Sequence, residues 1–285
     1  MNYELVNTIN PGLADWPAMK ARVQKENGKV LTLASAPGLL GVLKQENVQG
    51  LNVIDELTKR KYHAQDYLFF DRVPVPTATD IIMQSDGVIT LIYDGETIGY
   101  VTTYAGTRRA VKEVRYINPD NTLDNIEEYA FDGSHYTTIF YYNNEPQQIQ
   151  FFNNQGQVCL RFFLYEKVVN LITIEDPATG KVLQRYDTMT DFYIARLQQI
   201  LNAGDRVTID YMGVELFALA KTASHNVLHL VESPFDENDQ IRGNLKMILD
   251  NSIPYIQEVE MSQAAYNALA LRNYPLTKIT VVKDQ

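Results

Sequence analysis

The chain has 285 residues, of which 45% are hydrophobic and 21% charged, a composition that supports a folded core and excludes a disordered protein. The formal net charge of -10 argues against nucleic acid as the main partner, because phosphate binding needs clustered Lys and Arg. No apolar run approaches the roughly 20 residues of a membrane-spanning helix. The first residues lack the order of a signal peptide, so we expect a cytoplasmic protein. The single cysteine, Cys159, excludes an internal disulfide and a multi-cysteine metal site.

Residues 1–74 have the mixed pattern of the first part of an α/β domain. Pro17 suits the first turn of a helix, and the apolar run that follows this helix is typical of a strand buried in a parallel sheet. Pro74 and Pro76 cannot continue a central strand, which predicts a domain boundary beside them. The expected elements are helices over 15–26 and 38–46 and strands over 29–35 and 67–70.

Residues 75–189 have a different pattern, in which short β-branched and aromatic runs alternate with turn residues every eight to twelve positions. This pattern predicts an inserted antiparallel β-meander domain. Asn, Asp and Gly fill the turns, where tight hairpins need positive φ; examples are Asp94-Gly95, Asp132-Gly133 and Asn143-Asn144. Strands are expected over 88–93, 100–104, 111–117, 127–131, 137–142, 148–153, 157–164 and 168–174.

Residues 190–285 return to the α/β pattern. Thr190 is expected to be the N-cap of a helix that Gly204 closes, and Ser262 to cap the last helix. Strands are expected over 206–211, 227–232, 256–261 and 277–282, and further helices over 214–221 and 241–249. Strands that alternate with helices imply a parallel sheet with right-handed crossovers.

Two domain arrangements fit these three parts. In the first, residues 1–74 and 190–285 form one Rossmann-like domain, into which residues 75–189 are inserted. In the second, the three parts are successive small domains. The insertion is favoured, because about 74 residues with two or three strands would leave a parallel sheet with too few covered faces.

Signatures of catalysis are scarce. The segment Ala36 to Gly41 after the first predicted strand lacks the Gly-x-Gly turn of dinucleotide-binding proteins, and the chain has no phosphate loop and no nucleophile elbow. His225 and His229 would share a face on a helix, where they could bind a metal. Their segment instead reads as a strand, which places them about 13 Å apart. We therefore expect neither a metal site nor a cofactor.

One loop has the position of a binding site. Glu232-Ser233-Pro234 ends a predicted parallel strand, where α/β domains place their binding crevice, and Asp236, Glu237 and Asp239 follow closely. An acidic loop that lines a ligand cleft is one interpretation. A solvated surface loop is the other and is favoured.

The predicted meander carries the candidate contact residues. Arg108 and Arg109 form a basic cluster with Lys112 and Arg115, which could bind an acidic partner or simply solvate an exposed face. Alternation sends half of the aromatic side chains to each face of a sheet, so one aromatic face would be exposed unless the meander closes on itself as a barrel or sandwich. The predicted partner- or acceptor-binding residues are Arg108, Arg109, Tyr129, Tyr141, Tyr142 and Phe151.

A family resemblance rests on three features. They are the segment Phe69-Phe70-Asp71-Arg72-Val73-Pro74-Val75-Pro76-Thr77, the Tyr- and Asn-rich meander after it, and the order from Tyr211-Met212-Gly213 to Glu232-Ser233-Pro234. Together they resemble the stabilising (co-activator) subunit of a bacterial O-GlcNAc transferase complex that is associated with the accessory Sec system and glycosylates serine-rich repeat adhesins. The resemblance runs along most of the chain.

The resemblance implies one half of a glycosyltransferase-B-type fold, a Rossmann-like domain interrupted by the β-meander. It also implies a subunit that does not transfer sugar. Its partners would be the catalytic O-GlcNAc transferase subunit and the serine-rich acceptor polypeptide, at a cytoplasmic location that includes peripheral contact with the inner face of the cell membrane. Family members continue into a second Rossmann domain, whereas this sequence is expected to end with the first. Two alternatives stay open: a retaining glycosyltransferase that uses UDP-GlcNAc, and a carbohydrate-binding module with exposed tyrosines as stacking platforms.

Overall fold

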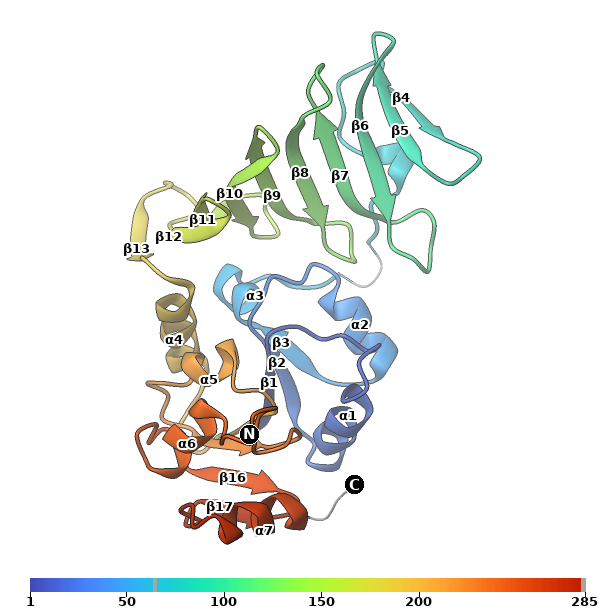
Figure 1. Ribbon diagram of the computed structural model, residues 1–285. Helices are drawn as coiled ribbons and strands as arrows, with labels where there is room; N and C mark the ends of the chain where they lie inside the picture. Colours follow the sequence, from blue (N-terminus) through green and yellow to red (C-terminus); the bar gives the residue numbers. More distant parts are fainter. Residues whose placement is uncertain (64–65, 283–285) are drawn as a thin grey trace. The chain divides into compact units, whose positions relative to one another are not determined.

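The computed structural model describes residues 1–63 and 66–282. They form a seven-stranded parallel sheet with helices and a ten-stranded antiparallel sheet (Figure 1), which confirms the predicted fold class. The chain divides into two compact units. The α/β unit comprises residues 1–35, 46–53 and 190–285, and the β unit comprises residues 36–45 and 54–189. Over the described ranges, no helix has the length and apolar character to cross a membrane.

The α/β unit is built on a parallel sheet with the strand order β17-β16-β15-β14-β1-β2-β3. Its strands are β1 (Asn2–Val6), β2 (Lys29–Thr32), β3 (Gly50–Asn52), β14 (Arg206–Ile209), β15 (His225–His229), β16 (Glu258–Met261) and β17 (Ile279–Val281). Its helices are α1 (Trp16–Lys25), α4 (Met189–Ile200), α5 (Val214–Ala218), α6 (Gly243–Leu249) and α7 (Gln263–Leu271). Strand β1 pairs with both β2 and β14, so the two ends of the chain share one sheet, which three successive domains would not produce.

The first helix shows why this sheet forms where it does. Trp16, Met19 and Val23 recur at helical spacing on α1 and pack with Val6 and Val30 of the sheet in one buried cluster. The indole N–H of Trp16 donates to Glu46 at 2.9 Å. The predicted helix over 15–26 is confirmed. At the other end of the unit, Ser262 caps α7 as predicted, because its hydroxyl accepts from the amide of Ala265.

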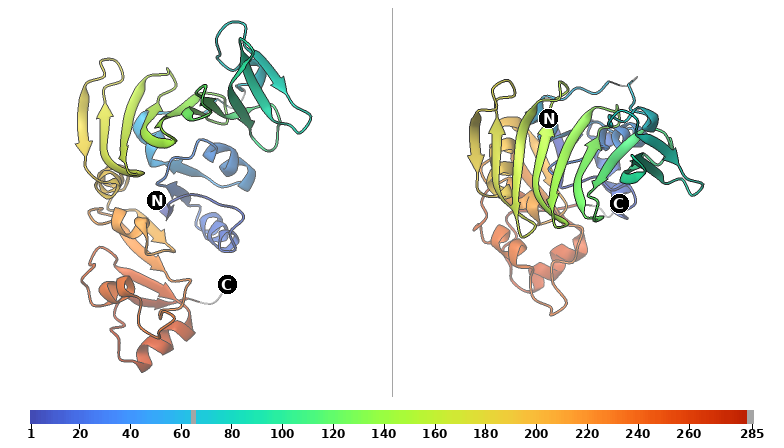
Figure 2. Two further views of the ribbon diagram at one scale, coloured as in Figure 1. Left: turned by 45° about the horizontal axis from the view of Figure 1, so that its top comes forward. Right: turned by 90° about the horizontal axis from the view of Figure 1, so that it is seen from above.

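The β unit is a meander in which every strand pairs antiparallel with the next one in the chain (Figure 2). Its strands are β4 (Asp80–Met83), β5 (Ile89–Tyr93), β6 (Glu96–Thr103), β7 (Val111–Ile117), β8 (Leu123–Tyr129), β9 (His135–Tyr142), β10 (Glu145–Phe152), β11 (Val158–Tyr165), β12 (Val168–Glu175) and β13 (Val182–Tyr186). The helices α2 (Leu39–Glu46) and α3 (Val53–Thr58) precede it. The predicted turns are confirmed: Gly95, Gly133, Asn143 and Asn144 all have positive φ.

The strand expected over 67–70 is wrong. Phe69 makes only an isolated bridge to Ala110, and Phe70–Arg72 is a turn of 3-10 helix. The apolar pattern of this segment has another cause: Leu68 and Phe70 pack on the buried core of strands β5 to β8, which also contains Val73. The segment covers a sheet instead of joining one.

Three further expectations differ from the structure. Helix α4 begins at Met189, so Thr190 lies inside its first turn and is not the N-cap. Strands β1, β3, β4 and β13 were not predicted. The division into compact units places residues 36–45 and 54–74 with the antiparallel sheet, whereas the predicted boundary assigned them to the first part of the Rossmann-like domain.

Candidate functional site

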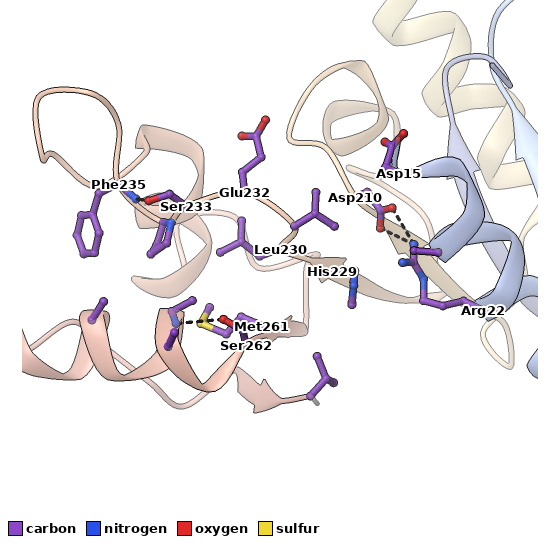
Figure 3. Close-up of a pocket in the computed structure, with 17 residues that line it drawn as sticks. Asp15, Arg22, Asp210, His229, Leu230, Glu232, Ser233, Phe235, Met261 and Ser262 are labelled. Carbon is purple, nitrogen blue, oxygen red and sulfur yellow. Dashed lines mark hydrogen bonds and ion pairs between the residues drawn. The ribbon is translucent and has the colours of Figure 1, made fainter. Parts of the chain in front are cut away.

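The α/β unit contains a cleft of about 650 Å³ at the carboxyl ends of β14, β15 and β16 (Figure 3). Helix α1, the loops after β14 and β15, and the first turns of α7 line it. Ligands of open α/β sheets bind at this edge, because the loops there are free to vary while the sheet holds them in place. The cleft is therefore the candidate functional site.

Three buried ionisable side chains meet beside one end of the cleft, which two of them, Arg22 and Asp210, line. Arg22 of α1 donates from Nε and Nη2 to both oxygens of Glu4 on β1, at 2.9 and 3.0 Å. Its Nη2 also donates to Asp210, which follows β14, at 2.6 and 2.7 Å. All three residues are less than a tenth exposed. We call Glu4, Arg22 and Asp210 the buried triad.

In the buried triad one guanidinium pairs with two carboxylates, and this excess of negative charge affects the pKa of Glu4. Burial raises the pKa of Glu4 to about 7, although the hydrogen bond from Arg22 acts in the opposite direction. Near neutral pH the Glu4 carboxyl is therefore protonated for part of the time. In that state Arg22 and Asp210 balance each other, and the triad carries no net charge.

A second polar group extends along β14, β15 and β16. Nδ1 of His229 lies 3.1 Å from Glu260, which also accepts from Arg206 at 2.7 Å. Arg206 donates in addition to Glu258, whose second neighbour is His225 at 3.2 Å. The strand reading of the two histidines is confirmed. Each of them faces its own glutamate, and within the described part of the chain no His, Cys, Asp and Glu cluster suited to a metal occurs.

The loop after β15 forms one wall of the cleft. Glu232, Ser233, Pro234 and Phe235 line it, whereas the acidic residues that follow do not. Arg272 holds this loop in place, because its guanidinium lies 3.8 Å from the ring centre of Phe235 and donates to Asp239 at 2.7 Å. Of the predicted acidic loop, the part that begins at Glu232 thus faces the cleft. The part around Asp236 forms a solvated turn.

A smaller cavity of about 120 Å³ lies beside the cleft, between the ends of β1 and β14. The strand order reverses its direction between these two strands, which is the position where doubly wound sheets bind ligands. Tyr211 closes this position by donating a short hydrogen bond to Asp15, a residue that lines both cavities. This bond raises the pKa of Tyr211 to about 12. The small cavity is suited to water or a single small group.

Among the lining residues that the structure describes, the cleft combines many hydrogen-bond acceptors with one balanced cation, Arg22. Asp15, Asp210 and Glu232 offer carboxylates, and Ser233 and Ser262 offer hydroxyls that already accept one bond each. A nucleophile with its base and an orienting group does not occur among the lining residues that the structure describes. This set of groups is suited to holding a polar ligand.

The predicted contact residues lie in the β unit, and two of them are core residues. Phe151 is 1% exposed and packs edge-on against the rings of Tyr136 and Phe162. Tyr129 is 4% exposed and belongs to the core of strands β5 to β8. The prediction that Phe151 and Tyr129 contact a partner directly is therefore wrong, because both side chains point into the core of the β unit.

Tyr142 and Tyr141 lie on opposite faces of β9. Tyr142 is 70% exposed, and Tyr141 is half-buried. Phe140, two residues before Tyr142, and Phe163 both pair with Gln148, and Phe163 pairs in turn with Leu171. Together with Tyr165, two residues after Phe163, these side chains lie on one face of strands β9 to β12. Phe140, Tyr142 and Tyr165 are exposed there, and Phe163 and Leu171 are half-buried. We call Phe140, Tyr142, Phe163, Tyr165 and Leu171 the aromatic face.

Arg108 and Arg109 lie in the turn between β6 and β7, and both are exposed. Within this turn Arg108 has a φ of 51°, which is a left-handed backbone conformation. Apart from Arg115, which pairs with Glu113 at 2.6 Å, the basic side chains of this cluster make no ion pair with a described residue. They retain the charge to bind an acidic group.

Sequence reasoning missed Arg60, which follows α3. Its guanidinium donates to the backbone carbonyls of His135 and Phe152, at 2.8 and 2.6 Å, and lies 4.9 Å from the ring centre of Tyr136. These contacts join the segment before the meander to strands β9 and β10. Arg60 stands between Lys59 and Lys61, and nothing in this short basic run indicates which of its side chains is buried against the sheet.

The parallel sheet with an antiparallel insertion between β3 and β14 defines one half of a glycosyltransferase-B-type fold that carries a β-sheet insertion. No protein-family model matches the chain, and no curated protein does.

Solved structures match its whole length. A chain of the glycosylation-associated protein (Gap123) complex from Streptococcus agalactiae is 13% identical with a TM-score of 0.73, and 99% of this chain aligns with 60% of that one. For the GtfA/B complex bound to UDP and GlcNAc the identity is 18%, the TM-score 0.72 and the coverage 99% and 61%. For the pneumococcal O-GlcNAc transferase GtfA in complex with UDP and GlcNAc, the values are 14%, 0.77, and 99% and 59%. At these identities the likeness establishes the fold. The chain spans about 60% of the length of these proteins.

Proposed function

We propose that this chain is the non-catalytic subunit of a protein O-glycosyltransferase complex, which stabilises the catalytic subunit and binds a serine-rich acceptor polypeptide. The observation that carries the proposal is the aromatic face on a transferase-type fold. Phe140 and Tyr142 on β9 and Tyr165 on β11 are exposed there, on the two strands that flank β10, outside the core of the β unit. The presence of similar chains in the Gap123 and GtfA/B complexes supports the same role.

The chemistry of the aromatic face favours a protein partner. Tyrosine has a large apolar ring with a polar hydroxyl at its tip. Because it has few rotatable bonds, it loses little conformational entropy when it is fixed, and it is enriched at interfaces. Gln148 and Gln150 alternate with the aromatic side chains and supply hydrogen bonds at the same surface. Arg108 and Arg109 offer a separate basic contact, and half-buried Tyr141 contributes from the other side of β9.

The direct test combines the purified chain with a candidate catalytic subunit. We expect the two to co-purify, the thermal unfolding temperature of the catalytic subunit to rise, and sugar transfer to a serine-rich acceptor to increase. The double variant Phe140→Ser, Tyr142→Ser removes aromatic area from the proposed interface. It should weaken association by roughly tenfold or more, as expected for interface anchors.

The matched control is Tyr100→Ser, which removes an exposed tyrosine from the opposite face of the same sheet. This variant should associate as the unchanged chain does. If the unchanged chain, the double variant and the Tyr100→Ser control all associate equally with the catalytic subunit, the aromatic face is not the interface. No stabilisation and no gain in transfer with the unchanged chain would refute the proposed function itself.

A second candidate function is catalysis, as a retaining transferase that uses UDP-GlcNAc. The cleft at the carboxyl ends of β14 to β16 and the shared fold with GtfA favour it. Titration of the chain alone with UDP-GlcNAc separates the candidates, since binding in the micromolar range would support the enzyme. For the proposed subunit the location is the cytoplasm, with peripheral contact to the inner face of the membrane, which sedimentation with anionic vesicles would test.

A further inference from the structure

Three exposed arginines of the β unit have no carboxylate beside them. They are Arg72, Arg108 and Arg109, whose side chains bond to no residue within the described ranges. The remaining exposed arginines of those ranges each form an ion pair with a carboxylate, at 2.6 to 3.0 Å; they are Arg115, Arg185 and Arg272. We call Arg72, Arg108 and Arg109 the arginine site.

Backbone hydrogen bonds hold the three arginines close together, although they come from separate parts of the sequence. The backbone amide of Phe70 donates to the carbonyl of Arg109 at 3.0 Å, and Phe69 forms an antiparallel bridge with Ala110. The backbone amide of Arg72 donates to the carbonyl of Phe69 at 2.9 Å. The segment before the meander therefore lies beside the turn between β6 and β7, and the arginine side chains emerge from one small area.

The turn between β6 and β7 is fixed by further hydrogen bonds. The hydroxyl of Thr107 accepts from the backbone amides of Arg109 and Ala110, at 3.3 and 2.9 Å. At the start of the turn, the hydroxyl of Tyr104 donates to the carbonyl of Tyr129 at 2.7 Å. Because the backbone is ordered before a ligand arrives, little conformational entropy is lost when the arginines bind one.

Two aromatic rings border the arginine site. Tyr67 is 45% exposed, and its ring stacks with that of Phe69 at a centroid distance of 6.1 Å. Phe69 is half-buried, and its bridge to Ala110 places it next to Arg109. Arginine and tyrosine are enriched together at protein interfaces, where the guanidinium binds a carboxylate through two hydrogen bonds and the ring packs on an apolar side chain.

The charge of the whole chain restricts what can bind at the arginine site. The formal net charge is -10, so the site is a small basic area on an acidic protein. A nucleic acid or a bilayer of anionic lipids would bring its negative charge close to the acidic surface around the site as well. A short acidic segment can confine its carboxylates to the three arginines. The site therefore suits a bounded acidic ligand better than an extended anionic surface.

We propose that the arginine site binds an acidic segment of a protein other than the catalytic subunit, with carboxylates on Arg72, Arg108 and Arg109 and an apolar side chain on Tyr67. This interaction goes beyond the proposed function. The arginine site belongs to the turn between β6 and β7 and the segment beside it, whereas the aromatic face belongs to strands β9 to β12. The two surfaces can therefore be occupied by two different proteins.

The test uses the full chain and a fluorescein-labelled peptide of glutamate and glycine that carries one phenylalanine. We expect fluorescence anisotropy to show saturable binding, which weakens several-fold when the salt concentration rises from about 50 mM to about 200 mM. The double variant Arg108→Gln, Arg109→Gln should weaken binding by roughly tenfold or more, because it removes two cationic hydrogen-bond donors. The matched control Lys181→Gln, Arg185→Gln removes the same charge from exposed positions at β13 and should change binding by less than about twofold.

Tyr67→Ser tests the aromatic part of the site. This variant should bind the same peptide several-fold more weakly, because the phenylalanine loses the ring on which it packs. A second peptide, with serine in place of phenylalanine, should bind the variant and the unchanged chain equally. Circular dichroism during thermal unfolding checks that all variants fold.

Several results would overturn the proposal. They are an unchanged chain that does not bind the glutamate peptide, an equal loss of binding in the double variant and its control, and equally tight binding of a peptide with glutamine in place of glutamate. Sedimentation with phosphatidylglycerol vesicles is the last measurement. If the unchanged chain sediments with them and the double variant does not, the arginine site contacts a membrane, and its assignment to a polypeptide is overturned.

Discussion

Replacing Glu4 by Gln should stabilise the α/β unit at alkaline pH and have little effect in acid. The amide keeps the shape of the carboxyl and an oxygen that accepts from Arg22, but it has no proton to lose. In the unchanged chain the buried Glu4 carboxyl shares the single guanidinium of Arg22 with Asp210. Ionisation of Glu4 therefore places a second negative charge in the buried triad.

The pKa of Glu4 gives the size and sign of the effect. Burial raises this pKa from 4.5 to about 7, so the folded chain binds the proton more tightly than the unfolded chain does. Glu4 then stabilises the fold fully below pH 4.5, and this stability is lost as pH rises to 7. Linkage gives a change of about 2.5 kcal/mol between pH 5 and pH 8, which the Gln variant should not show.

Trp16 provides the assay. It is the only tryptophan of the chain and lies in the buried cluster of α1, so its fluorescence follows the unfolding of the α/β unit. Urea unfolding at pH 5, 6, 7 and 8 should give nearly equal free energies for the two proteins at pH 5. At pH 8 the variant should be more stable by about 2 to 3 kcal/mol.

Glu26→Gln is the matched control. Glu26 is exposed and accepts from the side chain of Asn2, so its replacement should leave the pH profile parallel to that of the unchanged chain. Parallel profiles for Glu4→Gln as well, at any level of stability, would refute the reasoning, because they would mean that Glu4 titrates alike in the folded and unfolded chain.

Three further predictions concern the β unit. Phe151→Ala should lower its free energy of unfolding by about 3 to 5 kcal/mol, because a core ring is replaced by a cavity; circular dichroism during thermal unfolding measures this, and a loss below about 1 kcal/mol would contradict the burial. Arg60→Met leaves two backbone carbonyls without their donor and should cost about 2 to 4 kcal/mol in the same assay, and unchanged stability would mean that these contacts contribute nothing. Tyr142→Ala should leave the unfolding temperature within about 2 °C but weaken association with the catalytic subunit, and a clear loss of stability would show that this ring belongs to the core.

The sequence was sufficient for the elements whose pattern is local. Most meander strands were found because apolar alternation and turns of the Asp-Gly or Asn-Asn type recur over short distances, and the strand β7 matches its predicted range. Strands β4 and β13 were missed because they are edge strands, whose residues are largely exposed and show little apolar alternation. Strand β1 was missed because Glu4 interrupts its apolar pattern, although Glu4 is buried with Arg22.

The candidate site was less accessible to sequence reasoning, because its residues meet only through the sheet. Arg22 and Asp210 are 188 positions apart, and nothing near either residue indicates the other. Glu232 was expected at the end of a strand, in a loop for which a solvated surface was the favoured interpretation; β15 ends earlier, at His229, and Glu232 lines the cleft. Phe151 was misassigned because strict alternation predicts that one of two adjacent aromatic residues is exposed, whereas both Phe151 and Phe152 are buried and the register of β10 shifts between them.

The pairing of β1 with β14 constrains the order in which the chain folds during synthesis. Each antiparallel strand from β4 to β13 finds its neighbour within a few residues of chain, so that sheet can grow as the ribosome advances. Strand β1 must wait for about 200 further residues before β14 exists, which at roughly 5 to 20 residues per second takes about 10 to 40 s. Throughout that interval one edge of β1 keeps unpaired amide and carbonyl groups that another strand could capture. Early protection of the amino-terminal segment is therefore a requirement that this topology places on the cell.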